Sequence, residues 1–265
     1  MELLQWAYDE KICVAKEDDM ICHNAIAHGH IDIFQWAIKN GFVFKNHDIA
    51  GYEACKNGHL EALKFLIDND DYDVEVGGGS YGESCGYCNS AACKGQLDIV
   101  IWLHENYEPN CNGNTLVEAI SSGHVPTVKY LLEKDCGWDD CDDPYQVAAI
   151  VGPLEIIQLL HSHDSEWDED AIVEKAAEGG HLDIVQWAKE NGCPLTESAC
   201  QYAAGFGHFD TLKGLRDMGC PWDEGTTTYA STDEIYNWAT KNGCPVAKGK
   251  PREKLERSFD WLSDE

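Results

Sequence analysis

The chain has 265 residues, 43% of them hydrophobic, and a formal net charge of −29. This charge disfavours nucleic acid as a direct partner, because phosphate binding needs a basic face. No run approaches the ~18 apolar residues of a membrane span, and the N-terminus lacks the basic segment and apolar run of a signal peptide.

One pattern recurs along the chain about every 28 residues: a Gly-His pair followed by a run of the type Leu-Asp-Ile-Val-Gln-Trp-Ala. Its clearest copy is residues 180–188, and residues 1–7 match the run without the Gly-His pair. Further copies, some with the His replaced, begin at Gly29, Gly58, Gly95, Gly123, Gly152 and Gly207, and a decayed copy begins at Ser231. A fixed period indicates a stack of small units rather than one globular core.

Each unit begins with a short helix that carries a small residue at a fixed place. When the His of Gly-His is taken as position 0, position −5 is alanine in seven successive units: Ala25, Ala54, Ala91, Ala119, Ala148, Ala176 and Ala203. Because small residues let a neighbouring helix approach closely, this row predicts first helices that pack tightly in a stack.

The run after the His has the spacing of a second, longer helix. Positions +3, +4 and +7 are mostly apolar, as in Ile184, Val185 and Ala188, which gives one broad buried face. We expect the large side chains at position +6 to belong to the core: Trp6, Trp36, Phe65, Trp102, Tyr130, Leu159 and Trp187.

Position +2 is acidic in almost every unit: Glu2, Asp32, Glu61, Asp98, Glu155, Asp183, Asp210 and Glu234. There a carboxylate meets the free N–H groups and the positive end of the helix dipole. The glycine before the His is expected to end the first helix in the left-handed conformation. We expect the His itself to bond a nearby backbone group, and we assign it no chemistry.

The second helix is followed by Gly-Cys-Pro or a related connector, as at residues 192–194, where glycine stops the helix and proline prevents its return. Three aspartates in these connectors, Asp139, Asp168 and Asp223, are predicted to cap the next first helix. Each unit is therefore a helix, a tight turn, a longer helix and a short connector.

The segment Ala-Ala-x-x-Gly-His-Leu-Asp-Ile-Val, from Ala176 to Val185, resembles the core of the ankyrin repeat. The resemblance covers nearly all of residues 1–247, although the Thr-Pro-Leu-His start is absent and the period is about 28 instead of 33. It implies an all-α solenoid with shortened connectors in place of long β-hairpins, and non-catalytic protein binding. The short-period variant is similar to arrays of giant DNA viruses, oomycetes and algae.

The connector at residues 70–87 is longer than the others, with alternating apolar residues followed by three glycines. A small hairpin or a mobile loop fits this pattern, and long loops in compact arrays are often functional. Its acidic and aromatic side chains are the candidate partner-binding residues: Asp71, Tyr72, Asp73, Glu75, Tyr81, Glu83 and Tyr87.

The cysteines raise a second hypothesis, a structural-metal or redox site built from Cys85, Cys88 and Cys93, because the first two have Cys-x-x-Cys spacing. Against it, Cys88 shares position −8 with two other cysteines, which indicates a small buried residue. The repeat accounts for seven of the 13 cysteines in this way. We therefore predict no catalytic residue, no metal and no cofactor, and a reducing, intracellular location in cytoplasm or nucleus (of the host cell, if the chain is viral).

The domain expectation is one array of about eight units at residues 1–247, which begins with a half unit, and a capping helix or tail at residues 248–265. Leu255, Phe259 and Leu262 would share one face of that helix. The predicted function is a monomeric scaffold that binds a basic protein through its connectors and first helices, without contacting nucleic acid or a membrane directly. A further alternative is an acidic mimic of nucleic acid that occupies a DNA-binding protein.

Overall fold

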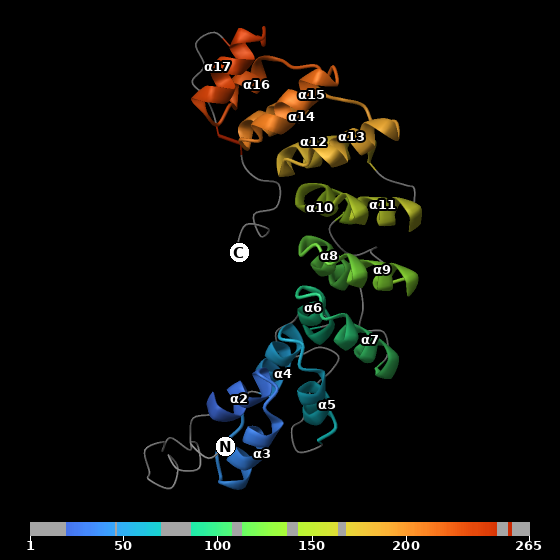
Figure 1. The fold of residues 1–265 in the computed structure, drawn as a ribbon, viewed down its shortest axis with the longest axis vertical. Coiled ribbons are helices and arrows are strands. Elements are labelled where there is room, and N and C mark those ends of the chain that lie inside the picture. Colours follow the sequence, from blue (N-terminus) through green and yellow to red (C-terminus); the bar gives the residue numbers. More distant parts are fainter. Residues whose placement is uncertain are drawn as a thin grey trace. The chain divides into compact units, whose positions relative to one another are not determined.

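The computed structural model describes residues 20–45, 47–69, 86–107, 113–136, 143–163, 168–247 and 254–255. Within these ranges the chain is all-helical, with 16 helices and no strand (Figure 1). The expected fold class, helix pairs joined by short connectors in place of β-hairpins, is confirmed for this part of the chain.

Helices of two kinds alternate, as the repeat predicts. The first helices are α2 (Met20–Ala27), α4 (His47–Lys56), α6 (Gly86–Ala92), α8 (Gly113–Ser121), α10 (Pro144–Val151), α12 (Glu169–Gly179), α14 (Glu197–Gly205) and α16 (Glu224–Thr228). The second helices are α3 (Ile31–Lys39), α5 (Leu60–Ile67), α7 (Leu97–Asn106), α9 (Val125–Glu133), α11 (Leu154–His163), α13 (Leu182–Glu190), α15 (Phe209–Asp217) and α17 (Asp233–Lys241).

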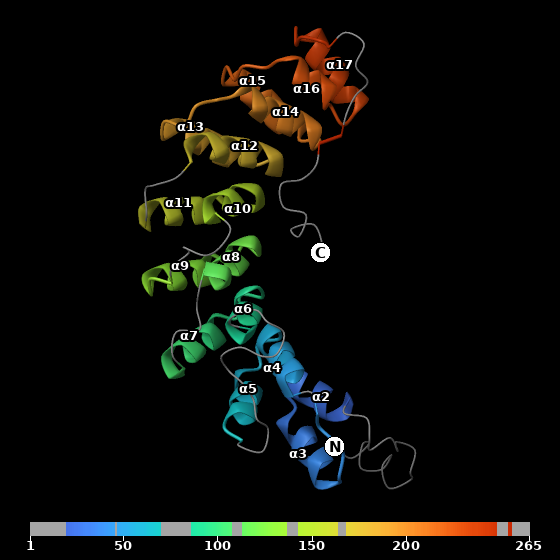
Figure 2. The same ribbon diagram turned by 180° about the vertical axis from the view of Figure 1, so that it is seen from behind.

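The chain divides into two compact units, residues 1–119 and 120–265. In the first unit, α2, α4 and α6 pack in that order and each contacts its own second helix. In the second unit, the first helices α10, α12, α14 and α16 pack in succession, and so do the second helices α9, α11, α13 and α15. The helix pairs of this unit follow one another as layers, which Figures 1 and 2 show from opposite sides.

The alanine row lies where the first helices meet. All of its members are buried, with exposed fractions of 3% or less: Ala25, Ala54, Ala91, Ala119, Ala148, Ala176 and Ala203. Methyl side chains at this place bring successive first helices into contact without voids, so the prediction of a closely packed stack is confirmed inside each unit.

The second helices supply mainly larger apolar side chains to the core, whereas the first helices supply many alanines. Ile184, Val185 and Ala188 are fully buried in α13, and the corresponding residues of the other second helices are mostly buried as well. The rings at position +6 are only partly buried, so they lie at the edge of the core and not inside it. Phe65 shows how a ring at this place can reach the neighbouring unit, because it meets Phe34 edge to face with 5.7 Å between centroids.

The turn between the two helices contacts the next unit directly. Gly180 has the expected positive φ of 83°, and a Cβ at this residue would collide with the imidazole of His208. In the same turn, His181 Nε2 lies 2.9 Å from the carbonyl oxygen of Ile150 in the preceding unit, to which it donates. The expected bond from the His to a backbone group is thus present, and it joins consecutive units.

Helix N-termini confirm two of the predicted caps. Asp168 Oδ1 accepts from the amide of Ala171 at 3.2 Å, and Asp223 Oδ1 accepts from the amide of Gly225 at 2.9 Å. Asp139 lies outside the described residues. Helix α10 is capped instead by Asp143, a cap that the connector pattern did not indicate.

Other expectations fall partly or wholly outside the described residues. These are the half unit at residues 1–7, most of the long connector and most of residues 248–265. Lys254 and Leu255 are described and are not helical. Leu255 lies against Gly205 at the end of α14, so closely that a Cβ on this glycine would collide with it. Leu255 thus contacts a first helix that precedes the last unit.

Candidate binding surface

Six of the seven candidate residues lie in the part of the long connector outside the described residues: Asp71, Tyr72, Asp73, Glu75, Tyr81 and Glu83. Tyr87 is the seventh, and it is 2% exposed. Its ring packs against Tyr52 with 4.8 Å between centroids. Burial, followed by the nearby Asp48 carboxylate, raises the pKa of the Tyr87 hydroxyl. Tyr87 is a core residue between α4 and α6, so we exclude it from the surface considered below.

Two of the three cysteines proposed for a metal or redox site, Cys88 and Cys93, lie in the described part of the chain. Cys88 is 2% exposed within α6. Cys93 is partly exposed, its Sγ lies 3.2 Å from the carbonyl oxygen of Ser90, and burial raises the pKa of its thiol. Cys85 is not among the described residues. Within the described part of the chain, no three or more His, Cys, Asp or Glu side chains gather in a way that could hold a metal ion.

The first helices carry the clearest candidate for a binding surface. In α14 the buried residues Ala199, Cys200, Ala203 and Ala204 occupy one side of the helix. Tyr202 lies on the opposite side and is partly exposed. We call the side of the first helices that faces away from this core the first-helix face.

Four side chains of α12 and α14 form a cluster on this face, which we call the α12–α14 patch: Lys175, Glu178, Tyr202 and Phe206. The two rings stack with centroids 6.2 Å apart and planes 5° apart. Lys175 Nζ lies 5.8 Å from the centroid of Tyr202 and 3.3 Å from Glu178 Oε2. The patch therefore presents flat aromatic surface beside an ammonium group held in place, a combination suited to contact with another protein.

The electrostatics of the patch keep the tyrosine neutral. Burial raises the pKa of the Tyr202 hydroxyl, and the carboxylates of Glu174 and Glu178 raise it further. A neutral hydroxyl both donates and accepts a hydrogen bond, so Tyr202 can pair with either kind of group on a partner. Glu174 is itself positioned by Thr196, whose hydroxyl lies 3.1 Å from Glu174 Oε1.

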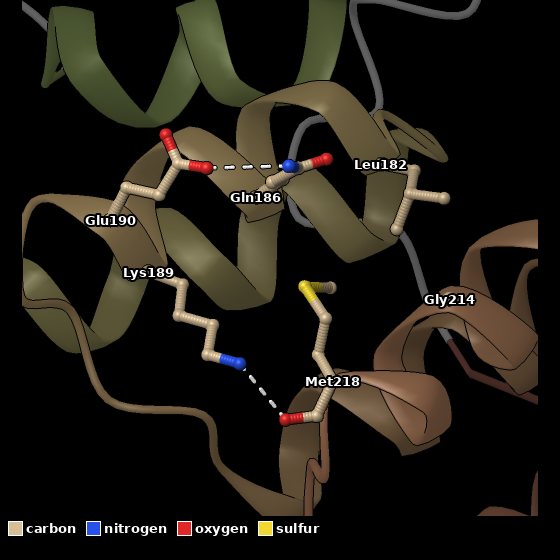
Figure 3. A pocket seen from close by; sticks show the side chains of 6 residues that line it. All are labelled: Leu182, Gln186, Lys189, Glu190, Gly214 and Met218. Carbon is tan, nitrogen blue, oxygen red and sulfur yellow. Dashed lines mark hydrogen bonds between the residues drawn. The ribbon is translucent and has the colours of Figure 1, made fainter.

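A hollow of about 400 Å³ lies on the other side of the second unit, between α13 and α15 (Figure 3). Its walls are Leu182, Gln186, Lys189 and Glu190 from α13, and Gly214 and Met218 from α15 and its end. Lys189 Nζ donates to the carbonyl oxygen of Met218 at 3.0 Å and so bridges the two walls.

Both surfaces carried a signal in the sequence. Lys175 and Tyr202 each stand at position −6 of their units, so the repeat alone brings them side by side. Gly214 stands at position +6, where most other units have a ring. Sequence reasoning expected binding through the connectors and the first helices, but every individual candidate residue that it named lies in the long connector at residues 70–87.

Two comparisons with known families agree with this architecture. Residues 22–67 match a family model of ankyrin repeats in many copies, and residues 89–168 match a model of three ankyrin repeats. No curated protein matches the chain. None of the helices in the described ranges is long and apolar enough to cross a bilayer.

Proposed function

The chain is an ankyrin repeat protein, and we propose that it is a non-catalytic scaffold that binds another protein through its first-helix face and connectors. Ankyrin repeats are protein-binding modules, and stacked repeats offer extended binding surfaces. The observation that supports this proposal most is the α12–α14 patch, whose two rings are partly exposed beside the largely buried Lys175–Glu178 ion pair, in which the side chains are 14% and 4% exposed.

Rigidity matters because association costs the ordering of side chains at the interface. Tyr202 is held by its stack with Phe206, and Lys175 is held by Glu178, so these groups are largely ordered before a partner arrives. Tyrosine and other large amphipathic side chains dominate binding energy in protein interfaces. We therefore assign the patch a central place in the binding surface, with the acidic long connector as a second contact.

We further propose that the partner is basic, because a chain with a net charge of −29 attracts positive surfaces and repels acidic ones. Such attraction chiefly raises the association rate and weakens as salt screens it. The binding should accordingly lose affinity between low and high ionic strength.

The test is affinity capture from the native cell with the wild-type chain, the double variant Tyr202→Ala/Phe206→Ala and the control variant Gln158→Ala. Gln158 is an exposed residue of the second helix α11, so its loss changes a surface of the same unit outside the patch. We expect the patch variant to lose its partner and the control to retain it, with recovery decreasing as salt increases. Equal capture by all three chains would refute the role of the α12–α14 patch in binding. Recovery that does not change with salt would refute the electrostatic contribution to binding.

The exposed carboxylates on the second helices favour an alternative, an acidic mimic of nucleic acid. In residues 120–265 they stand at the same place on successive helices and are all exposed: Glu155, Asp183, Asp210 and Glu234. If this row carries the function, changing these four residues to their amides should abolish capture, whereas the patch variant should bind normally. The opposite result favours the first-helix face.

We also propose that the chain acts as a monomer inside the cell, in cytoplasm or nucleus. The repeat places seven of the 13 cysteines at two fixed positions as small structural residues, which suits a reducing compartment better than a disulfide framework does. A disulfide-linked or dimeric native form, detected by non-reducing electrophoresis or light scattering, would contradict this proposal.

A further inference from the structure

The rings at position +6 make the same kind of contact in several units. Phe65, Trp187 and Trp238 reach back to the second helix of the preceding unit. Trp238 meets Phe209, at position +1 of that unit, with 5.5 Å between centroids. Trp187 meets His161, at position +8, also at 5.5 Å. The ring at position +6 therefore packs between consecutive second helices and fills the space between them.

Helix α15 lacks this ring, because Gly214 stands at position +6 of its unit. The residues that face the missing ring are Leu182, Gln186 and Lys189, which stand at positions +1, +5 and +8 of the preceding unit. These same residues line the hollow of about 400 Å³ between α13 and α15. The hollow thus lies where the other units place a large side chain. Leu182 lies close to Gly214: a Cβ on this glycine would lie 2.5 Å from both of the leucine's δ-methyl groups, so a larger residue there requires the leucine side chain to rotate away.

The lining suits a flat aromatic ring. Leu182 and Met218 offer an aliphatic surface and a thioether, and thioethers make favourable contacts with aromatic rings. The Lys189 ammonium lies in the wall, fixed by the Met218 carbonyl oxygen, where it can interact with the face of a ring. Gln186 and Glu190 are exposed at the rim, with Glu190 Oε1 accepting from Gln186 at 3.3 Å.

We propose that this hollow binds an aromatic side chain, tryptophan or phenylalanine, presented by a partner protein. The guest ring takes the place that Trp187, Trp238 and their counterparts fill from within the chain. The choice of a protein as the source rests on the proposed function, whereas the affinity for a ring rests only on the geometry of the hollow.

The methionine methyl groups give a direct test, because the chain has only three methionines. Met218 lines the hollow, whereas Met20 is 59% exposed at the start of α2 in the other compact unit. The intact protein, labelled with ¹³C at the methionine methyl groups, is titrated with N-acetyl-tryptophanamide as a surrogate for a side chain. We expect a saturable upfield shift of the Met218 signal with a Kd on the order of 1 mM, and no shift at Met20. The Met218→Leu variant assigns the signal.

Two variants that fill the hollow from within serve as controls. Gly214→Trp restores the ring, and Gly214→Leu copies Leu159, which stands at this position in an earlier unit. We expect either one to abolish the Met218 shift, and helical circular dichroism verifies that the variant is folded. The wild-type titration does not depend on them: a Met218 signal that does not move, or moves equally with N-acetyl-leucinamide, would overturn the proposal.

Free tryptophan distinguishes the two sources of a ring. A hollow that receives a side chain should bind the peptide-like N-acetyl-tryptophanamide at least as tightly as the free amino acid. Tighter binding of free tryptophan would overturn the assignment to a protein partner and would make the hollow a site for a small aromatic molecule. None of these results depends on the α12–α14 patch, so the capture experiment on the patch can fail independently.

Discussion

Alanine at Gly180 should destabilise the stack far more than alanine at Gly219, although both glycines have nearly the same backbone conformation. Their φ angles are 83° and 86°. A left-handed non-glycine residue costs about 1–2 kcal/mol, partly offset by about 0.4–1 kcal/mol from the reduced entropy of the unfolded chain. At Gly219 nothing lies within 4 Å of the added Cβ, so we expect a loss of about 1 kcal/mol there.

At Gly180 the same methyl group also meets the imidazole of His208 from the next unit. Forcing an extra carbon into a packed contact adds about 1–3 kcal/mol, so the total loss should be about 2–4 kcal/mol. Urea unfolding followed by circular dichroism measures both variants. Equal m-values are required before the free energies of unfolding are compared.

The His208→Ala background isolates the contact in a double-mutant cycle. Without the imidazole, the cost of Gly180→Ala should fall towards that of Gly219→Ala. A loss at Gly180 that equals the loss at Gly219, or that persists unchanged without His208, would refute the inference that the turn of one unit packs on the His of the next.

Three further predictions concern the same inter-unit contacts and the buried groups. Thr211→Val removes the 2.8 Å bond from its hydroxyl to the Gly180 carbonyl oxygen and should cost about 1 kcal/mol in urea unfolding; a variant as stable as the wild type would contradict a stabilising role for this bond. Burial, followed by the nearby histidines, lowers the pKa of His59 below its ordinary value of 6.5. The folded state therefore disfavours the proton, stability should fall as the pH drops below about 6.5, and His59→Gln should reduce this slope in thermal melts between pH 5 and 8. Burial raises the pKa of Cys244 to about 11 and that of Cys55 as well, so alkylation at pH 8 with peptide mapping should leave both thiols unmodified until denaturant is added.

The sequence predicts most of the fold because the repeat imposes the same local requirements in every unit. A glycine with a positive φ, a small residue at the first-helix contact and an acidic first turn each follow from elementary helix geometry. Ala176, Gly180 and Asp183 meet these requirements within a few residues of one another. Each of these signals is weak in a single unit, but their recurrence at a fixed spacing identifies the helix pairs along the chain.

The binding surface was harder to predict, because it depends on where helices begin and on contacts between units. Tyr87 was assigned to the connector, but α6 begins at Gly86. Tyr87 is therefore a helical residue, and its ring points into the core. Tyr202 and Phe206 form a stack because they stand one helical turn apart, with Phe206 as the residue that caps the C-terminus of α14. Position −6 contained the signal for the patch, yet its side chains differ from unit to unit, so no repeated residue type draws attention to it.

The most direct test of the central claim, binding through the first-helix face, is site-specific photo-crosslinking in the native cell. The photoreactive amino acid p-benzoylphenylalanine replaces Tyr202 in one chain and the exposed second-helix residue Gln158 in another. We predict one abundant crosslinked protein from position 202, which decreases with added salt, and none from position 158. Crosslinks confined to position 158 would contradict the account.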